Sequence, residues 1–203
     1  MEENKKRFTG RVVWNELFGR ILTVRGITEM AVLIAIAIIF DQPFLKIRIG
    51  EAASFSLTML PLLLIALRFP LIDAFLGIGG IYGFITMLMD GYGIITYPLD
   101  YLLAYGSLSL VALFQGLVYK KHRNEITNYL FLALAVIAGV SGRIFFSTLS
   151  GVIVYETAFG ASFVYNAVPM SVSGAICIAL LVMLFPTLLR FKPQITNIEI
   201  IEQ

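Results

Sequence analysis

The sequence predicts an all-α membrane protein, a bundle of six transmembrane helices with both termini in the cytoplasm. Of the 203 residues, 59% are hydrophobic and 14% are charged, whereas soluble domains have about 45–50% apolar and about 25% charged residues. The charged residues gather at the two ends and in short connecting segments. Most of the apolar runs between them reach the roughly 20 residues that a helix needs to cross a bilayer.

The apolar runs also define the expected order of elements. No run shows the alternating pattern that builds a membrane β-barrel, and the chain has no internal repeat. We expect a basic, amphipathic extension over residues 1–26, a six-helix membrane domain over 27–190 and a short cytoplasmic tail over 191–203. The spans are expected at 27–40, 52–68, 70–89, 98–119, 129–150 and 167–189. The first is short, so we expect it to begin before Ile27.

The extension at residues 1–26 allows two interpretations. Its large apolar side chains recur at helical spacing, at Trp14, Leu17, Phe18, Ile21 and Leu22. This pattern is typical of an amphipathic helix that lies on a membrane surface. It fits equally well a helical continuation of the first span.

Basic residues set the expected orientation, because cytoplasmic connections carry an excess of lysine and arginine. They occur before the first span, in the second and fourth connections and after the sixth span, at Lys5, Lys6, Arg7, Arg11, Arg20, Arg25, Arg68, Lys120, Lys121, Arg123, Arg190 and Lys192. The third and fifth connections carry Asp90 and Glu156 and no basic residue, so they are expected outside. We therefore expect a multi-pass protein of the cell membrane.

The residue inventory argues against an enzyme. One cysteine, Cys177, lies in an apolar run, and one histidine, His122, lies in a basic connection. So far apart, the two cannot form a zinc site or a catalytic nucleophile pair. No segment has the spacing of a phosphate-binding P-loop, so we expect no ATP hydrolysis by this chain. We also expect no cofactor, no bound metal and no nucleic-acid partner.

Two ionisable residues within the apolar spans are candidate site residues, because a charge inside a membrane is costly. Asp100 follows Pro98 at the expected outer start of the fourth span. It either complements the helix dipole there or belongs to a binding site. Arg143 falls near the middle of the fifth span, where it either contacts a ligand or pairs with groups inside the bundle.

Tyrosines gather at the expected outer ends of the last four spans. An interfacial belt explains some of them, but Tyr105 lies one turn further into its helix, on the same face as Tyr101. A carboxylate surrounded by aromatic rings is a typical site for a flat organic cation, with about 0.5–2 kcal/mol for each cation–π contact. Asn166 adds a hydrogen-bond donor and acceptor at the same depth.

Small residues form two further patterns. Gly79 and Gly83 have the G-x-x-x-G spacing that lets membrane helices pack closely. Ala31 and Ala35 have the same spacing in the first span. The alanine pair allows two interpretations, packing inside the bundle or docking to another membrane subunit.

Five segments, taken in order, resemble a known family. They are the alanine-rich run Glu29 to Ala37, the run from Ser54 through Pro61 to Arg68, the run Leu99-Asp100-Tyr101-Leu102-Leu103-Ala104-Tyr105-Gly106, the run Gly142-Arg143-Ile144-Phe145-Phe146 with Ser150 to Ile153, and the pair Tyr165-Asn166. Together, over roughly residues 29–190, they resemble the substrate-binding S component of energy-coupling factor (ECF) vitamin transporters, and most closely the thiamine-specific S component.

The resemblance implies a six-helix bundle that captures a vitamin from the outer face. Such a component works with a membrane coupling subunit, the T subunit, and with two cytoplasmic ATPase subunits. Asp100, Tyr101 and Asn166 match ligand-binding positions of the family, and Ala31 and Ala35 match its docking face. Together with other polar and aromatic residues of the expected outer halves of the last three spans, the candidate substrate-binding residues are Asp100, Tyr101, Tyr105, Arg143, Ser147, Tyr155 and Asn166.

Three positions depart from the family pattern. Leu102 stands where the family has proline, Ser147 where the thiamine binders have histidine, and Tyr155 where they have tryptophan. The leading hypothesis is therefore an S component for thiamine or a related heteroaromatic compound. One alternative is an S component for a different vitamin or a nucleobase precursor. Another, from a different class, is a non-transporting membrane scaffold protein.

Overall fold

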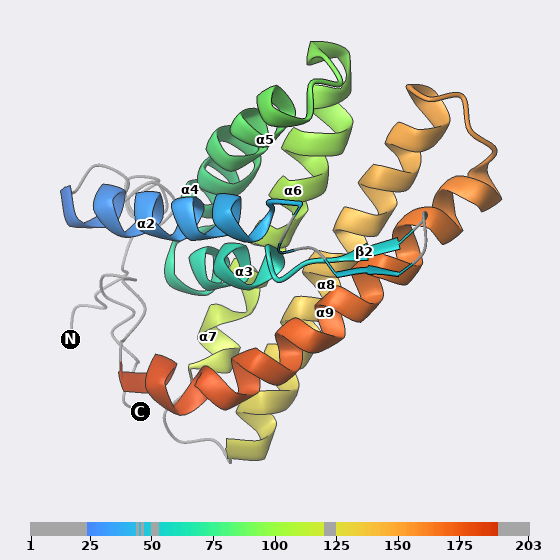
Figure 1. The fold of residues 1–203 in the computed structure, drawn as a ribbon. Helices are drawn as coiled ribbons and strands as arrows, with labels where there is room; N and C mark the ends of the chain where they lie inside the picture. Colours follow the sequence, from blue (N-terminus) through green and yellow to red (C-terminus); the bar gives the residue numbers. More distant parts are fainter. Residues whose placement is uncertain (1–23, 44, 46, 50–52, 120–124, 191–203) are drawn as a thin grey trace, which may run out of the picture.

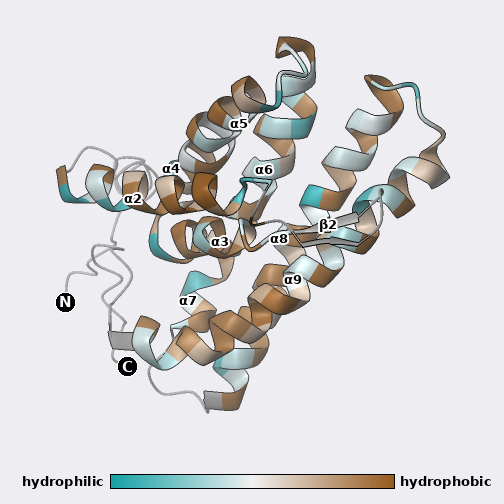
Figure 2. Cartoon of the chain, viewed as in Figure 1, coloured by the Kyte–Doolittle hydropathy of each residue, from teal (hydrophilic) through white to brown (hydrophobic). Residues whose placement is uncertain are grey.

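The protein is described by a computed structural model, which covers residues 24–43, 45, 47–49, 53–119 and 125–190. Almost all of the expected N-terminal extension and the whole expected C-terminal tail lie outside these residues. Helices make up most of the described chain (Figure 1), and hydrophobic residues dominate them (Figure 2). Four of the described helices are long and apolar enough to cross a membrane. The predicted all-α membrane protein is thereby confirmed.

The described part of the chain begins with a helix, a hairpin and a short helix. Helix α2 spans Val24–Phe40, so the helix at the first expected span starts before Ile27, as expected. A two-stranded antiparallel hairpin follows, with β1 at Ile47–Ile49, β2 at Ala53–Phe55 and Ile47 opposite Phe55. Helix α3 then spans Met59–Arg68. At 17 and 10 residues, α2 and α3 are shorter than the four long helices.

The expectation of a span at 52–68 is wrong in its first part. Helix α3 starts only at Met59, and no strand was expected where β2 lies. Hydroxyl side chains explain the late start, because Ser56 Oγ donates to the carbonyl oxygen of Phe40 at 3.0 Å and Thr58 Oγ1 donates to Asp41 at 3.3 Å. Serine and threonine that bind nearby groups in this way compete with helix formation.

The helices at the expected third and fourth spans are continuous and have irregular winding. The third, Leu71–Asp90, consists of α4 (Leu71–Phe75), η1 (Leu76–Tyr82) and α5 (Gly83–Asp90). The fourth, Ile94–Val118, consists of η2 (Ile94–Thr96), η3 (Tyr97–Leu103), α6 (Ala104–Gly106), η4 (Ser107–Phe114) and α7 (Gln115–Val118). It begins at Ile94 rather than at residue 98. Between the two spans the chain turns at Gly91, whose φ of 73° is the left-handed conformation that glycine adopts at helix ends.

Gly79 and Gly83 bring these two spans into backbone contact. A Cβ atom on Gly79 would meet the carbonyl oxygen of Leu102, and one on Gly83 would lie 2.9 Å from the carbonyl oxygen of Tyr101. The glycine pair is therefore a close-packing face, as its spacing predicted. Both η1 and η3 are π-helical, a winding that is frequent at functional sites. The packing places Asp100 and Tyr101, on η3, against the third span.

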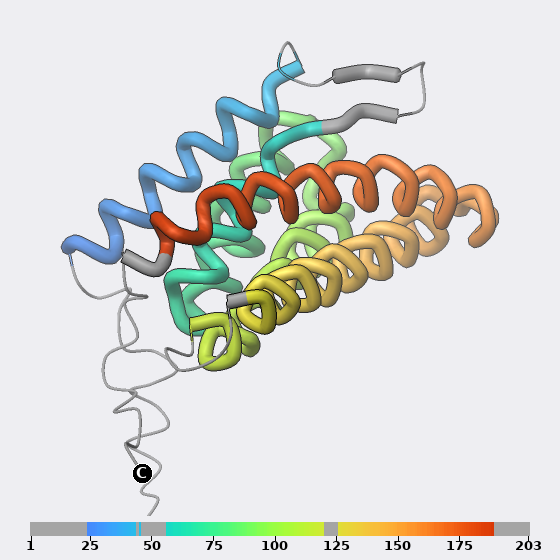
Figure 3. Tube along the Cα trace, turned by 90° about the horizontal axis from the view of Figure 1, so that it is seen from below, coloured from blue at the N-terminus to red at the C-terminus, as the bar shows by residue number. Residues whose placement is uncertain are grey.

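The last two helices lie side by side along much of their length (Figure 3). Helix α8 spans Glu125–Ile153, and helix α9 spans Phe159–Arg190. Helix α9 starts well before the expected residue 167, so Asn166 lies inside the helix and not at its start. Pro169 and Pro186 both lie within α9, so the helix continues through both prolines. The hairpin strand β2 packs against α9.

Gln115, in α7, is expected to stabilise the contact between the Ile94–Val118 helix and α3. Its buried Nε2 donates to the carbonyl oxygens of Ala66 and Phe69, both at 2.7 Å. These carbonyls lie at the end of α3, where the helix itself supplies no donors. Replacing Gln115 with alanine leaves them without this donor and should destabilise the fold by about 2–3 kcal/mol. Thermal unfolding in detergent should show a midpoint lower by roughly 4–8 °C.

The matched control is Gln42→Ala. Gln42 Nε2 donates to the carbonyl oxygen of Ile38 at 3.0 Å, a local bond at the end of α2, and this bond is only partly buried. Its loss should therefore lower the free energy of unfolding by less than about 1 kcal/mol. Equal midpoints for the two variants would show that the Gln115 amide does not hold the helices together.

Candidate functional site

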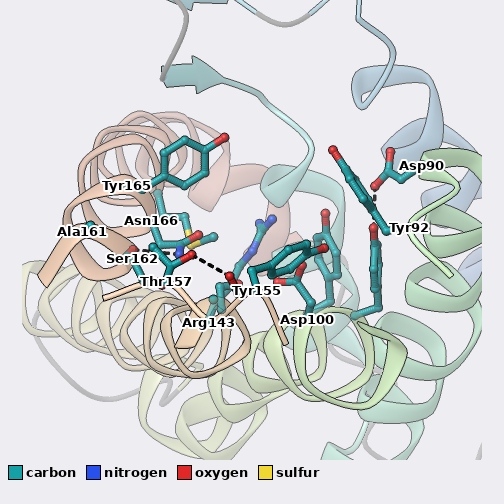
Figure 4. Close-up of a pocket in the computed structure, with 15 residues that line it drawn as sticks. Asp90, Tyr92, Asp100, Arg143, Tyr155, Thr157, Ala161, Ser162, Tyr165 and Asn166 are labelled. Carbon is teal, nitrogen blue, oxygen red and sulfur yellow. Dashed lines mark hydrogen bonds between the residues drawn. The ribbon is translucent and has the colours of Figure 1, made fainter. Parts of the chain in front are cut away.

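One large cavity lies between the end of the Leu71–Asp90 helix, the start of the Ile94–Val118 helix, the last turns of α8 and the first turns of α9. It has a volume of about 620 Å³. Its walls carry Asp90, Tyr92, Asp100, Tyr101, Tyr105, Arg143, Ser147, Gly151, Tyr155, Thr157, Ala161, Ser162, Tyr165, Asn166 and Met170. Figure 4 shows Tyr165 and Asn166 on one side, Asp90 and Tyr92 on the other, and Asp100 and Arg143 between them. The structure thus brings together all seven candidate residues, although they come from three separate helices and one connecting segment.

Asp100 lies on the wall formed by η3. Pro98 occupies the first turn of this helix, and Asp100 is the acidic residue of the same turn. The half-buried carboxylate has the buried Ser147 hydroxyl of α8 as a hydrogen-bond partner, and it interacts electrostatically with Arg143. The cavity thus contains a negative group that is oriented by a neighbouring helix.

Tyr101 connects this wall to the end of the third span. Its hydroxyl donates to Asp90 Oδ2 at 2.9 Å, and the residue is only 3% exposed. Gly83 lies so close to the Tyr101 backbone that a larger residue in place of Gly83 would collide with it. Tyr101 is consequently held at both ends, by packing at its backbone and by a hydrogen bond at its hydroxyl.

Arg143 lies in the cavity and also contacts the interior of the bundle. Its Cζ is 4.2 Å from the ring centroid of Tyr105, a cation–π contact. The Tyr105 ring in turn lies 6.2 Å from the Tyr101 ring, centroid to centroid. In the described part of the chain, Arg143 Nε has no hydrogen-bond partner. From this position Arg143 can both contact a ligand in the cavity and interact with groups inside the bundle.

Helix α9 supplies the opposite wall. Asn166 Nδ2 donates to the Ser162 carbonyl oxygen at 2.9 Å, which leaves its Oδ1 and its second N–H for a ligand. Ser162 Oγ donates to the Thr148 carbonyl oxygen at 3.0 Å. A Cβ atom on Gly151 would meet this serine hydroxyl. The absence of a side chain at Gly151 therefore lets α8 and α9 approach each other beside the cavity.

Two exposed tyrosines line the cavity from the segments that connect its helices. Tyr92 follows α5, and Tyr155 lies between α8 and α9. Their ring centroids are 6.2 Å apart, with the rings at 88° to each other. Partial burial, with a contribution from the Asp100 carboxylate, raises the pKa of the Tyr155 phenol. The phenol is protonated at neutral pH, as an unperturbed tyrosine is, and it can donate a hydrogen bond.

Several cavity residues were not among the sequence candidates. Asp90 had a signal, since it is the acidic residue of an expected outer connection, and Tyr92 and Tyr165 had one as outer aromatic residues. Thr157, Ser162 and Met170 had none, because isolated hydroxyl and thioether side chains occur throughout membrane helices. A smaller cavity of about 170 Å³ shares five of the lining residues, among them Arg143 and Asn166, and extends toward Asp41 and the start of α3.

The alanine pair of the first helix lies on a different surface. Ala31 and Ala35 are exposed and line an apolar groove of about 330 Å³ between α2 and the third span. The other side of the groove includes Ile81 and Ile85. The small side chains of Ala31 and Ala35 leave this surface open. This fits the interpretation of a docking face better than that of packing inside the bundle.

These features define a multi-pass helical membrane protein with an acidic, aromatic cavity for a small molecule. A family model described as thiamine transporter protein (Thia_YuaJ) matches residues 27–193. The chain belongs to this family of thiamine transporter proteins, which confirms the resemblance seen in the sequence. Membership of this family assigns it to transport at the cell membrane rather than to catalysis.

The fold is also found in a solved structure. A structure of ThiT from Listeria monocytogenes is similar with a TM-score of 0.62 and 20% sequence identity, over 92% of this chain and 98% of that one. At this identity the likeness shows the fold alone. No curated protein sequence matches the chain.

Proposed function

We propose that the protein is the S component of an ECF importer and that it binds thiamine in the 620 Å³ cavity. One observation supports this most strongly. The residues that resemble the family's ligand-binding positions, together with the aromatic and polar candidates, all line one cavity in a chain of the thiamine transporter family. The named structural relative, ThiT, has the same fold.

Each lining residue has a role that suits this ligand. Thiamine combines a positively charged thiazolium ring with a neutral aminopyrimidine. Asp100 pairs with the cationic or the aminopyrimidine part, and Tyr101, Tyr105 and Tyr155 stack on the rings. Asn166 and Ser147 form hydrogen bonds with it. Arg143 holds the Tyr105 ring in place through the cation–π contact at 4.2 Å.

Ser147 supports thiamine less directly than the family's histidine would. A serine cannot stack on a ring, but its hydroxyl is a hydrogen-bond partner of Asp100. It thereby orients the carboxylate that the proposal places next to the ligand. Ser147 and Leu102 are also the residues that favour the alternative substrate class, another vitamin or a nucleobase precursor.

The membrane topology and the partners belong to the same proposal. The shorter helices α2 and α3 count as the first two of six spans, with both termini in the cytoplasm, as the distribution of basic residues indicates. A T subunit docks on the groove at Ala31 and Ala35, because small residues allow a partner helix to approach closely. Two ATPase subunits, bound to the T subunit, supply the energy. Purification of the native complex should recover these three partners with the protein.

The substrate is tested by calorimetric titration of the detergent-purified protein. Thiamine is compared with pyridoxine, riboflavin and aminopyrimidine precursors. Saturable, tight binding of thiamine alone supports the proposal. Tight binding of another compound keeps the carrier and changes its substrate, and no binding of any compound favours a membrane scaffold.

A further inference from the structure

We propose that Asp90 captures the cationic substrate at the mouth of the cavity and sets its rate of association, whereas Asp100 holds it inside. This inference rests on the proposed function, because it requires a positively charged ligand. It assigns a role to a residue that has no counterpart among the motifs that carry the family resemblance. The geometry of Asp90, its electrostatic surroundings and its exposure each support it.

The position of Asp90 is fixed by its neighbours. It is the last residue of α5, and Gly91 ends the helix directly after it. Tyr101 donates a hydrogen bond to its Oδ2 at 2.9 Å, so the carboxylate faces the cavity that both residues line. Figure 4 shows it beside Tyr92, across the cavity from Tyr165. An exposed side chain is thereby held at the rim rather than left to rotate in solvent.

The charges around Asp90 make the mouth attractive to a cation. The carboxyl end of a helix carries a partial negative charge, which adds to the negative charge of Asp90 at the end of α5. Asp90 also interacts electrostatically with Asp100 deeper in the site. The positive charge of Arg143 lies next to the buried Tyr105 ring and not at the rim. An approaching cation therefore meets a carboxylate first.

The exposure of Asp90 determines which step it affects. An exposed ion pair in water contributes little to the stability of a complex. Its field nevertheless extends over roughly 10 Å at 0.1 M salt, and clefts lined by one sign of charge raise the association rates of ions of opposite charge. Asp90 should therefore change the association rate more than the dissociation rate.

The test compares the association rate constants of radiolabelled thiamine in rapid-filtration measurements. The variant is Asp90→Asn, which keeps an oxygen acceptor for Tyr101 and removes the charge. At about 0.01 M salt we expect association to slow by roughly tenfold, with the dissociation rate within about twofold of wild type. At about 1 M salt the two proteins should have nearly equal association rates, because the charge is then screened.

Two controls separate steering from other effects. Glu156→Gln removes an acid from the segment between α8 and α9, and Glu156 does not line the cavity, so its association rate should fall by clearly less than that of Asp90→Asn. The neutral analogue 3-deazathiamine should associate equally fast with wild type and with Asp90→Asn. A merely structural role of Asp90 would slow the neutral analogue as well.

The failure of this inference differs from the failure of the proposed function. Wild-type protein that does not bind thiamine contradicts the proposed function, and with it this inference. Wild-type binding with an unchanged association rate in Asp90→Asn contradicts the inference alone. An equal loss in Glu156→Gln contradicts it too, since that result would assign the effect to net charge.

Discussion

Replacing Asp100 with alanine is expected to lower the affinity for thiamine by at least about a hundredfold. Asp100 is half-buried in the cavity, and its carboxylate is oriented by the buried Ser147 hydroxyl. Removing one partner of such a charge pair costs about 3 kcal/mol or more, which corresponds to about two powers of ten in the dissociation constant. Calorimetric titration of the purified variant measures this loss.

Asp100→Asn is the control for charge, because it keeps the size of the side chain and an acceptor oxygen. Its affinity should lie between those of wild type and Asp100→Ala. The competing interpretation is that Asp100 only complements the dipole at the start of η3. In that case the alanine variant would unfold at a lower temperature and bind thiamine as tightly as wild type, and the assignment of the site would be wrong.

Replacing both Ala31 and Ala35 with leucine is expected to lower transport by about tenfold or more while thiamine binding stays intact. The two alanines line an open apolar groove between α2 and the third span, away from the ligand cavity. Larger side chains would fill the groove and keep a partner helix at a distance. Overpacking of this kind costs about 1–3 kcal/mol per site, so uptake into cells that contain the partner subunits should fall by about tenfold or more.

The matched control places leucines elsewhere on the same helix. Val32 and Ile36 are exposed on another face of α2, and the Val32→Leu, Ile36→Leu double variant should transport normally. Calorimetry on the Ala31→Leu, Ala35→Leu variant should give the wild-type affinity for thiamine. Normal uptake by this variant would show that the groove is not the docking face, and lost binding would show that the alanines instead support the fold of the cavity.

The sequence was informative wherever a residue type is costly in a membrane. Asp100 and Arg143 were recognisable because few charges lie within apolar spans, and the helical spacing of Tyr101 and Tyr105 placed them on one face. The close packing at Gly79 and Gly83 could also be predicted, because their spacing leaves one face of a helix without side chains. These signals depend only on local composition and helical period.

Other features depend on contacts between distant segments and could not be predicted. The late start of α3 was hidden because it depends on the Ser56 and Thr58 hydroxyls, which bind Phe40 and Asp41 some sixteen residues earlier in the chain. Asp90 reads as an ordinary acid in a connection until Tyr101, eleven residues away, donates to it. The start of α9 was placed too late because its first turns are less apolar than the rest.

The central claim is that thiamine occupies the cavity lined by Asp100, Tyr101 and Asn166, and a crystal structure of the protein with bound thiamine tests it most directly. We expect electron density for the ligand between η3 and α9, with the Asp100 carboxylate and the Asn166 Oδ1 within hydrogen-bonding distance of it and a tyrosine ring against one of its rings. Thiamine bound elsewhere on the protein, with this cavity empty, would contradict the account.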